Sequence, residues 1–251
     1  MNIHKNKTAL VTASSGGIGF EIAEKLISEG CKVIINGRNK KKLLQAKKKL
    51  KNVEVFCGDL SREKQIKKLI NYIKKKHKKL DYLICNLGDS KKKSSNNFDI
   101  KEWKKFFDLN FWSTINIIFE SQKLLESSNG KILCISSICG KEYIQGAPVA
   151  YSVAKSSINN FVKFQSEILA KSSIRINAIA PGNILFKGSI WEKKIKKDKK
   201  SVKSFIDRNV PLKTFGTAQD IANMSSYLLS DKSKFITGSV FVVDGGQTKS
   251  I

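Results

Sequence analysis

Histidine and paired cysteines are scarce in this sequence. The two histidines lie far apart, so we expect no histidine-based metal site. The five cysteines form no C-x-x-C pair and stand mostly in apolar runs, which is typical of small buried side chains in a reducing compartment. We therefore expect a cytoplasmic protein without a bound metal. A redox pair of Cys134 with Cys139 is the less favoured alternative.

Long apolar runs are also missing. The longest, such as residues 33–35 and 82–85, are far too short to span a bilayer. The first residues pass straight into a strand-like run, without the apolar stretch and cleavage site of a secretory signal. The sequence therefore predicts no membrane segment and a mature chain that begins at Met1.

Acidic residues are few, with 21 against 47 lysines and arginines, and the formal net charge is +26. Such a charge is typical of proteins that bind polyanions. However, lysines recur on the polar side of nearly every predicted helix instead of forming one stripe. Only four of the basic residues are arginines: Arg38, Arg62, Arg175 and Arg208. We expect no specific nucleic-acid partner, only weak and salt-sensitive binding of anions.

Strand-like and helical patterns alternate along the whole chain. This alternation requires right-handed crossovers and a parallel sheet covered on both faces. The sequence therefore predicts an α/β fold, a Rossmann-like doubly wound parallel sheet in a single domain over residues 1–251. A loop-rich segment is expected at about 181–217. We predict strands at 7–13, 32–36, 53–57, 82–85, 131–136, 175–179 and 240–243, and helices that include 40–51, 100–127, 151–171 and 218–229.

A serine- and glycine-rich turn, residues 12–19, lies between the first predicted strand and the first predicted helix. Backbone N–H groups at such a helix start can hold a pyrophosphate, and Gly17 and Gly19 allow it to approach closely. Glycines also serve ordinary turns. The position of this turn after the first strand nevertheless favours a dinucleotide site.

The end of the second predicted strand lacks the acidic residue that binds the ribose of NAD. No Asp or Glu occurs between Glu29 and Glu54, whereas Arg38 stands where a guanidinium can pair with a 2′-phosphate. We therefore expect NADP(H) as the preferred cofactor, with NAD(H) possible. Asp59, just past the third strand, is placed to accept from the adenine amino group, although a helix-start acid would look the same.

Tyr151 and Lys155 are four residues apart, so on a helix both side chains project from one face. Ser137 follows the fifth predicted strand, at the sheet edge where α/β proteins bind ligands. A tyrosine can protonate a carbonyl oxygen that accepts hydride if its pKa of about 10 falls by roughly 3 units, or about 4 kcal/mol. We expect the Lys155 ammonium and the oxidised nicotinamide to lower the pKa of Tyr151 in this way. We expect Ser137 to hold the substrate oxygen. Asn110, inside the long helix, is expected to anchor a water between Lys155 and solvent.

These motifs together resemble the short-chain dehydrogenase/reductase family, in its 3-oxoacyl-carrier-protein reductase-like branch. The resemblance covers almost the whole chain. It rests on the glycine turn, Cys85-Asn86-Leu87-Gly88, Asn110, Ser137, Tyr151 with Lys155, Ala180-Pro181-Gly182 and Val242-Val243-Asp244-Gly245-Gly246. The resemblance implies that Asn110, Ser137, Tyr151 and Lys155 are catalytic. It also implies a homodimer or homotetramer formed through helices at about 100–127 and 151–171.

The residues that we expect to bind the cofactor combine this resemblance with the arguments above. They are Thr12, Ser14, Ser15, Gly17, Ile18, Gly19, Arg38, Asp59, Leu60, Asn86, Gly88, Tyr151, Lys155, Pro181, Gly182 and Ile184. The family pattern is not fully kept. Ala13 replaces a glycine, Leu87 replaces an alanine, and Asn183 and Phe186 stand where an aromatic residue and a threonine are common.

Substrate specificity is expected in a lid at about 183–215, with Ser137, Tyr151, Phe186 and Trp191 as substrate residues. Its apolar wall and lysine rim suit a small carbonyl or alcohol substrate that is linked to an anionic carrier, such as a 3-oxoacyl thioester, or that is a charged sugar. A lid helix whose lysines are merely solvated fits as well. Two alternatives stay open: an oxidoreductase of sugars or surface-carbohydrate precursors with the same residues, and a Rossmann protein that binds nucleotide without turnover.

Overall fold

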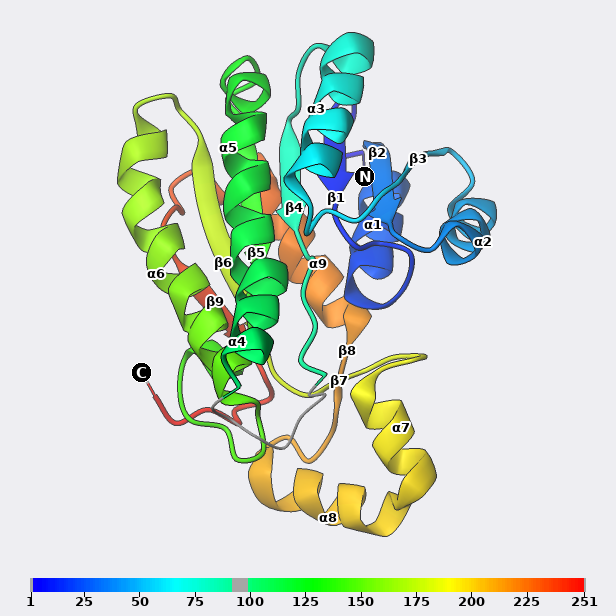
Figure 1. The fold of residues 1–251 in the computed structure, drawn as a ribbon, viewed down its shortest axis with the longest axis vertical. Helices are drawn as coiled ribbons and strands as arrows, with labels where there is room; N and C mark the ends of the chain where they lie inside the picture. The colour runs from blue at the N-terminus through cyan, green and yellow to red at the C-terminus, as the bar shows by residue number, and fades with distance from the viewer. Residues whose placement is uncertain (1, 92–98, 251) are drawn as a thin grey trace.

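One parallel sheet organises the molecule. The computed structural model describes residues 2–91 and 99–250. Its main sheet has the order β3-β2-β1-β4-β5-β6-β9 (Figure 1). The bounds are β1 Thr8–Val11, β2 Lys32–Gly37, β3 Val53–Cys57, β4 Tyr82–Cys85, β5 Lys131–Ile135, β6 Arg175–Pro181 and β9 Val240–Val243. Neighbouring strands pair in parallel. The predicted α/β class and doubly wound sheet are confirmed.

Strands β1 and β4 are buried along their whole length. Their residues are almost all apolar because a parallel strand at the centre of such a sheet has helices on both faces. The two strands pair in register from Ala9 with Tyr82. The strand order reverses between them, and doubly wound sheets bind ligands beyond the carboxyl ends of the strands at such a switch point.

Helices cover the sheet in two layers (Figure 1). On one face α1 (Gly17–Ser28), α2 (Lys40–Leu50) and α9 (Ala218–Leu229) enclose one apolar core. On the other face α3 (Glu63–His77), α5 (Ser113–Glu126) and α6 (Val149–Ala170) enclose the second. In α3, the buried positions Ile66, Leu69, Ile70 and Ile73 form a single stripe, so its lysines face water.

Two segments differ from their predicted structure. The helix expected over 100–127 consists of α4 (Ile100–Phe107), a π-turn (Asp108–Trp112) and α5. A π-turn keeps the helical direction and shifts the register by one residue, which the spacing of apolar residues does not reveal.

The loop expected over 181–217 instead holds two helices and a short strand pair. The pair is β7 (Ile184–Leu185) with β8 (Gly216–Thr217), and the helices are α7 (Ile190–Lys197) and α8 (Lys199–Asn209). The side chains of Ser189 and Asp198 cap the helix starts by accepting N–H groups. Lysines occupy many positions of these helices, so their few apolar residues do not form a clear helical pattern in the sequence.

The cysteines are free thiols, and the expectation that they are buried is wrong for one of them. Cys31, Cys85 and Cys134 are buried and Cys139 is partly buried, whereas Cys57 is exposed because it ends the outermost strand β3. Cys85 and Cys134 are register partners on β4 and β5. Within residues 2–91 and 99–250, no helix combines the length and apolar character needed to cross a membrane.

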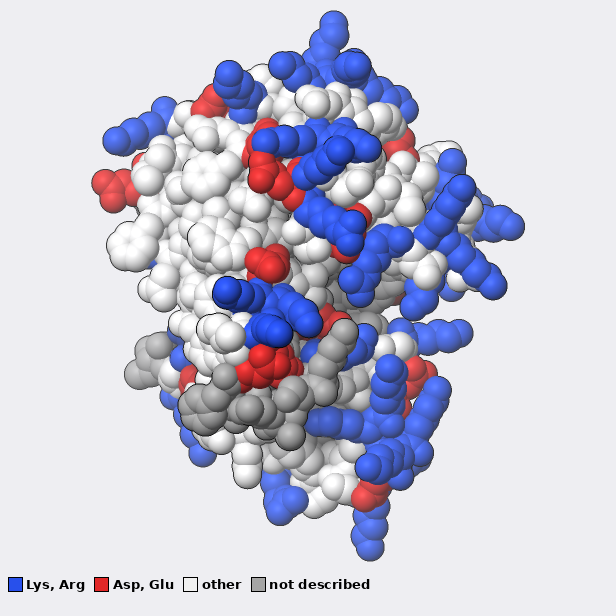
Figure 2. All heavy atoms as spheres, viewed as in Figure 1, with Lys and Arg blue, Asp and Glu red and all other residues white. Residues whose placement is uncertain are grey.

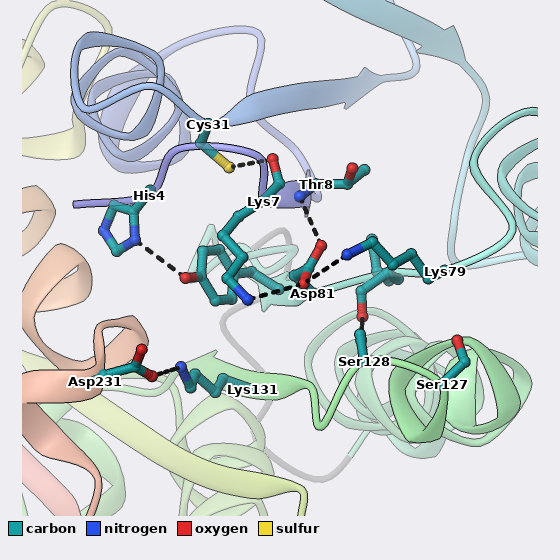
Figure 3. Close-up of polar contacts among 12 residues, drawn as sticks. His4, Lys7, Thr8, Cys31, Lys79, Asp81, Ser127, Ser128, Lys131 and Asp231 are labelled. Atoms are coloured by element: carbon teal, nitrogen blue, oxygen red, sulfur yellow. Dashed lines mark hydrogen bonds and ion pairs between the residues drawn. The ribbon is translucent and has the colours of Figure 1, made fainter. Parts of the chain in front are cut away.

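A buried polar cluster closes the amino edge of the sheet, opposite the ends that carry the site (Figure 3). The Asp81 carboxylate accepts the Thr8 N–H at 2.9 Å and the Lys7 ammonium at 3.3 Å. His4 is fully buried, with its ring nitrogens 3.1 Å from the Tyr82 hydroxyl and 3.1 Å from the Ser226 hydroxyl. These contacts tie the first residues of the chain to β4 and α9.

The buried His4 ring predicts a loss of stability in acid. Burial lowers the pKa of His4 below its ordinary value of 6.5, and the nearby Glu29 carboxylate only partly opposes this. The unfolded chain therefore takes up the proton first, so the contribution of neutral His4 is present above about pH 6.5 and is lost as the pH falls below it. We expect the urea midpoint to drop between pH 7.5 and pH 5.5, and to drop less in His4→Gln. An equal drop in both proteins contradicts the prediction.

Candidate active site

Ser137 and Tyr151 meet at the carboxyl edge of β5. Ser137 begins a short 3₁₀ turn, Ile138–Gly140, and its Oγ accepts the Cys139 N–H at 3.2 Å. Tyr151 lies in the first turn of α6. The Ser137 side chain is close enough to the phenol to lower its pKa, so the structure brings together these two residues, which lie 14 positions apart in the sequence.

Lys155 lies one helical turn beyond Tyr151 and is only 4% exposed. Its Nζ donates to the Ile135 carbonyl oxygen at 2.8 Å and lies 5.8 Å from the centroid of the Tyr151 ring. Burial lowers the pKa of Lys155 to about 8, against the opposing effect of the Cys134, Cys85 and Cys139 thiols. The ammonium is therefore held beneath the phenol by a backbone carbonyl.

The acidity of Tyr151 differs from the sequence expectation. Burial raises the pKa of Tyr151 above its ordinary value, and the hydrogen bond from Ser137 lowers it only in part. Lys155 is aimed at the Ile135 carbonyl, so in the protein alone its charge does not outweigh the desolvation of the phenol. The sequence analysis expected Lys155 and the oxidised nicotinamide together to lower this pKa, and in the protein without cofactor the pKa is raised.

Asn110 is fully buried in the π-turn. Its Oδ1 accepts the Asp89 N–H at 3.0 Å, and its Nδ2 donates to the carbonyl oxygens of Asp89 at 3.1 Å and Phe106 at 3.0 Å. Gly88 lies between Asn110 and Lys155, because a Cβ on Gly88 would be 2.8 Å from the Asn110 Oδ1 and 3.1 Å from the Lys155 Nζ. The π-turn thus presses Asn110 against the segment that follows β4, and only a glycine fits there.

The glycine turn makes the close approaches that a dinucleotide site needs. A Cβ on Gly19 would be 2.5 Å from the Asn86 Nδ2, and Gly17 has a φ of +61°. Asn86 in turn donates from Nδ2 to the carbonyl oxygens of Thr12 and Ala13, at 3.1 and 3.2 Å. The Asn86 side chain therefore helps to hold the turn at the start of α1. It fits a bound pyrophosphate.

The side chains of several predicted cofactor residues form contacts within the protein. The Ser14 hydroxyl donates to the Val11 carbonyl oxygen at 2.6 Å. Leu60 and Ile184 are buried in the two cores, and Ile18 packs against one of them. The side chains of Ser14, Leu60 and Ile184 are therefore engaged within the protein. Ser15 lies close to the backbone of the second strand, because a Cβ on Gly37 would be 3.1 Å from its Oγ.

Arg38 follows β2 and is 71% exposed along its side chain. Its Nη1 lies 4.0 Å from the Asp59 Oδ2, while the Asp59 Oδ1 accepts the Ser61 N–H and hydroxyl at 3.1 and 2.8 Å. The guanidinium is therefore lightly held and available to a phosphate. Asp59 and Arg38 stand side by side, which brings the two predicted contacts for the adenosine half together.

The two predicted substrate residues of the lid, Phe186 and Trp191, lie in different surroundings. The ring of Phe186 packs on the glycine turn, with its Cε2 2.7 Å from where a Cβ of Gly17 would lie. Trp191 belongs to an aromatic cluster inside the lid, 5.4 Å from the Phe205 ring and 5.3 Å from the Phe215 ring. The contact between Phe186 and Gly17 escaped the sequence analysis, because nothing in the pattern connects residues so far apart.

The turn after β6 packs tightly on the end of β9. The Gly182 N–H donates to the Val243 carbonyl oxygen at 2.9 Å, and a Cβ on Gly182 would be 2.6 Å from that of Asp244. Pro181, the last residue of β6, is thereby fixed at the edge of the site. Over the described ranges 2–91 and 99–250, no three His, Cys, Asp or Glu side chains gather in a way that could hold a metal ion.

The fold and the site together define the class of dinucleotide-dependent oxidoreductases. The family model described as enoyl-(acyl carrier protein) reductase matches residues 12–248. The chain is 33% identical to the 3-oxoacyl-(acyl-carrier-protein) reductase of Rickettsia felis over 96% of both chains. It belongs to the short-chain dehydrogenase/reductase family, as the sequence resemblance implied.

Two further relatives show how widely the family ranges. The 3alpha-hydroxysteroid dehydrogenase of Mediterraneibacter gnavus is 29% identical over 96% of both chains. The crystal structure of L-sorbose reductase from Gluconobacter frateurii with NADPH and L-sorbose has a TM-score of 0.92 and 26% identity over the whole of both chains. Family membership supports the expected NADP(H)-dependent interconversion of carbonyl and hydroxyl groups.

Proposed function

We propose that this protein is an NADP(H)-dependent reductase of 3-oxoacyl thioesters. The observation that carries the proposal is the position of buried Lys155, whose Nζ is 5.8 Å from the Tyr151 ring centroid and donates to the Ile135 carbonyl oxygen just before Ser137. The 33% identity to a 3-oxoacyl-(acyl-carrier-protein) reductase supports the substrate class. In this reaction a 3-oxo group becomes a 3-hydroxyl group.

Each catalytic side chain has a separate task in the proposed reaction. A bound NADPH would supply the hydride for the carbonyl carbon. Tyr151 gives its proton to the carbonyl oxygen, and Ser137 donates a hydrogen bond that holds this oxygen beside the phenol. Lys155, whose pKa of about 8 keeps it mainly protonated at neutral pH, stabilises the phenolate that is left. Asn110 fixes the backbone beside Lys155 and would anchor the water that returns the proton.

The cofactor is proposed to lie across the switch point of the sheet. The glycine turn would hold the pyrophosphate, and Arg38 would pair with the 2′-phosphate, with Asp59 beside the adenine. Phe186 packs on Gly17 at the place where many relatives have a threonine, so its ring would border the pyrophosphate in place of a hydroxyl contact.

The substrate is proposed to enter beneath the lid formed by residues 183–215. Lysines surround Trp191, and the Lys194 Nζ lies 4.5 Å from the centroid of the Trp191 ring. Such a rim suits an anionic carrier attached to the acyl chain. The whole-length likeness to L-sorbose reductase favours a keto-sugar as the second candidate, which would use the same catalytic residues.

Tyr151→Phe tests the proposed chemistry. We expect turnover of a 3-oxoacyl thioester, followed by NADPH oxidation, to fall about 100- to 10,000-fold because the proton donor is lost. The fluorescence titration with NADPH should stay unchanged. Assaying wild-type protein with 3-oxoacyl thioesters, simple ketones and keto-sugars separates the two substrate classes. Binding of NADPH without turnover of any of these compounds would refute an enzymatic role.

Arg38→Ala tests the preference for NADP(H). Loss of the charged hydrogen bond should weaken NADPH binding roughly 10- to 100-fold. NADH, which has no 2′-phosphate, should bind almost as before. Lys74→Ala is a matched control, because it removes one positive charge from the last turn of α3 near the opposite edge of the sheet. The prediction is wrong if Arg38→Ala weakens both nucleotides equally.

We also propose that the protein forms a homodimer or homotetramer through α5 and α6. Phe119, Phe164 and Ile168 on these helices are 53%, 72% and 57% exposed. The rings of Phe119 and Phe161 touch, 6.4 Å apart, which joins the two helices into one surface. Figure 2 shows few charges over α5 and α6, whereas Lys and Arg crowd the side that carries α2, α7 and α8. A largely apolar face on such a basic protein fits a second copy of the chain.

Phe164→Asp is expected to disrupt this assembly. Two symmetry-related copies would place the new carboxylates in an apolar contact, so sedimentation velocity should show a shift toward monomer. Leu44→Asp on α2 makes the same change at another exposed apolar residue and should leave the oligomer intact. Wild-type protein that sediments as a monomer at micromolar concentration would rule the assembly out.

A further inference from the structure

A pair of hydrogen bonds connects α6 to the segment that carries Ser137. The Asn159 side chain accepts the Ser136 hydroxyl at its Oδ1, at 2.6 Å, and donates from its Nδ2 to the Gly140 carbonyl oxygen at 3.0 Å. Ser136 precedes Ser137, which caps the 3₁₀ turn, and Gly140 is the last residue of the turn. Asn159 therefore spans this turn from one end to the other.

The orientation of the Asn159 amide is determined by its partners. The Gly140 carbonyl oxygen can only accept, so the Nδ2 has to face it and the Oδ1 has to face Ser136. The Ser136 hydroxyl is buried and also lies 3.3 Å from the Lys155 carbonyl oxygen. An aspartate at 159 would face the Gly140 carbonyl oxygen with a carboxylate, and a leucine would form neither bond.

The 3₁₀ turn also approaches the backbone of α6 very closely. A Cβ on Gly140 would be 2.6 Å from the Lys155 carbonyl carbon and 2.8 Å from the Ser156 nitrogen. Asn159 is four residues after Lys155 and eight after Tyr151, so all three share one face of α6. The same helix face thus holds the phenol, the ammonium and the amide that fixes the serine segment.

From this arrangement we propose that Asn159, with Ser136, is a positioning residue that sets the separation of Ser137 from Tyr151. The inference rests on the proposed reductase function and assigns a residue beyond the four catalytic ones. The bonds within the turn are those from the Cys139 N–H to the Ser137 Oγ, at 3.2 Å, and from the Gly140 N–H to the Ser137 carbonyl oxygen, at 2.9 Å. Asn159 adds two bonds that connect the ends of this short segment to α6. Without the amide, Ser137 moves relative to the phenol.

The test compares two neighbouring asparagines. Asn159→Leu removes both bonds at nearly constant volume, whereas Asn160→Leu alters an exposed side chain that bonds only within its helix, to the Ser156 carbonyl oxygen at 3.1 Å. For Asn159→Leu we expect kcat on the best substrate to fall about 10- to 100-fold, because a displacement near 1 Å has an effect of that size. The NADPH dissociation constant should stay constant. Asn160→Leu should match the wild type.

Two measurements distinguish positioning from a general loss of structure. Hydrogen exchange should speed up at residues 137–141 in Asn159→Leu only, and this can be measured even if no substrate is found. The basic limb of the pH–rate profile should move to higher pH, because the Ser137 hydrogen bond lowers the pKa of Tyr151, while Cys139 and Asp89 raise it. Absence of any turnover by wild-type protein would count against the proposed function alone.

Ser136→Ala provides a second variant if Asn159→Leu does not fold. It removes one bond by a smaller change and should also lower kcat at constant nucleotide affinity. The double variant should lose no more activity than Asn159→Leu, because both substitutions release the same turn. The inference is overturned by normal kcat and normal exchange in Asn159→Leu, or by equal losses of kcat and nucleotide affinity.

Discussion

The burial of one ammonium group organises the catalytic end of this protein. Lys155 lies almost out of contact with water and is held by the Ile135 carbonyl oxygen at the end of β5. The desolvation that lowers the pKa of Lys155 also raises the pKa of Tyr151 just above it. The two groups have similar pKa values in water, and burial moves these values apart.

Glycines allow the segments of the catalytic site to pack closely, because they have no Cβ at the points of contact. Gly88 leaves room for Asn110 and Lys155, Gly140 lies against the backbone of α6, and Gly19 lies against Asn86. At each position a Cβ would come within 3 Å of a side chain or backbone that forms the site. The site is therefore an interface between the ends of β4 and β5 and the helices that pack on them.

Much of the architecture could be predicted because it depends on local patterns. Apolar runs gave the strands of the sheet, and Ala218–Leu229 and Val240–Val243 lie where they were predicted. The π-turn at Asn110 and the lid helices were missed. A register shift of one residue leaves the apolar spacing almost unchanged, and in the lid the helix caps outweigh a weak apolar pattern.

The sequence by itself determined the class of fold, the family and the side chains available for proton transfer, since these follow from residue types and their order along the chain. Only the tertiary structure decided that Phe186 lies on Gly17, that Asn159 spans the serine turn, and that burial governs the acidity of Tyr151. Contacts and desolvation depend on distances between segments that are remote in sequence. Local periodicity carries no information about such distances.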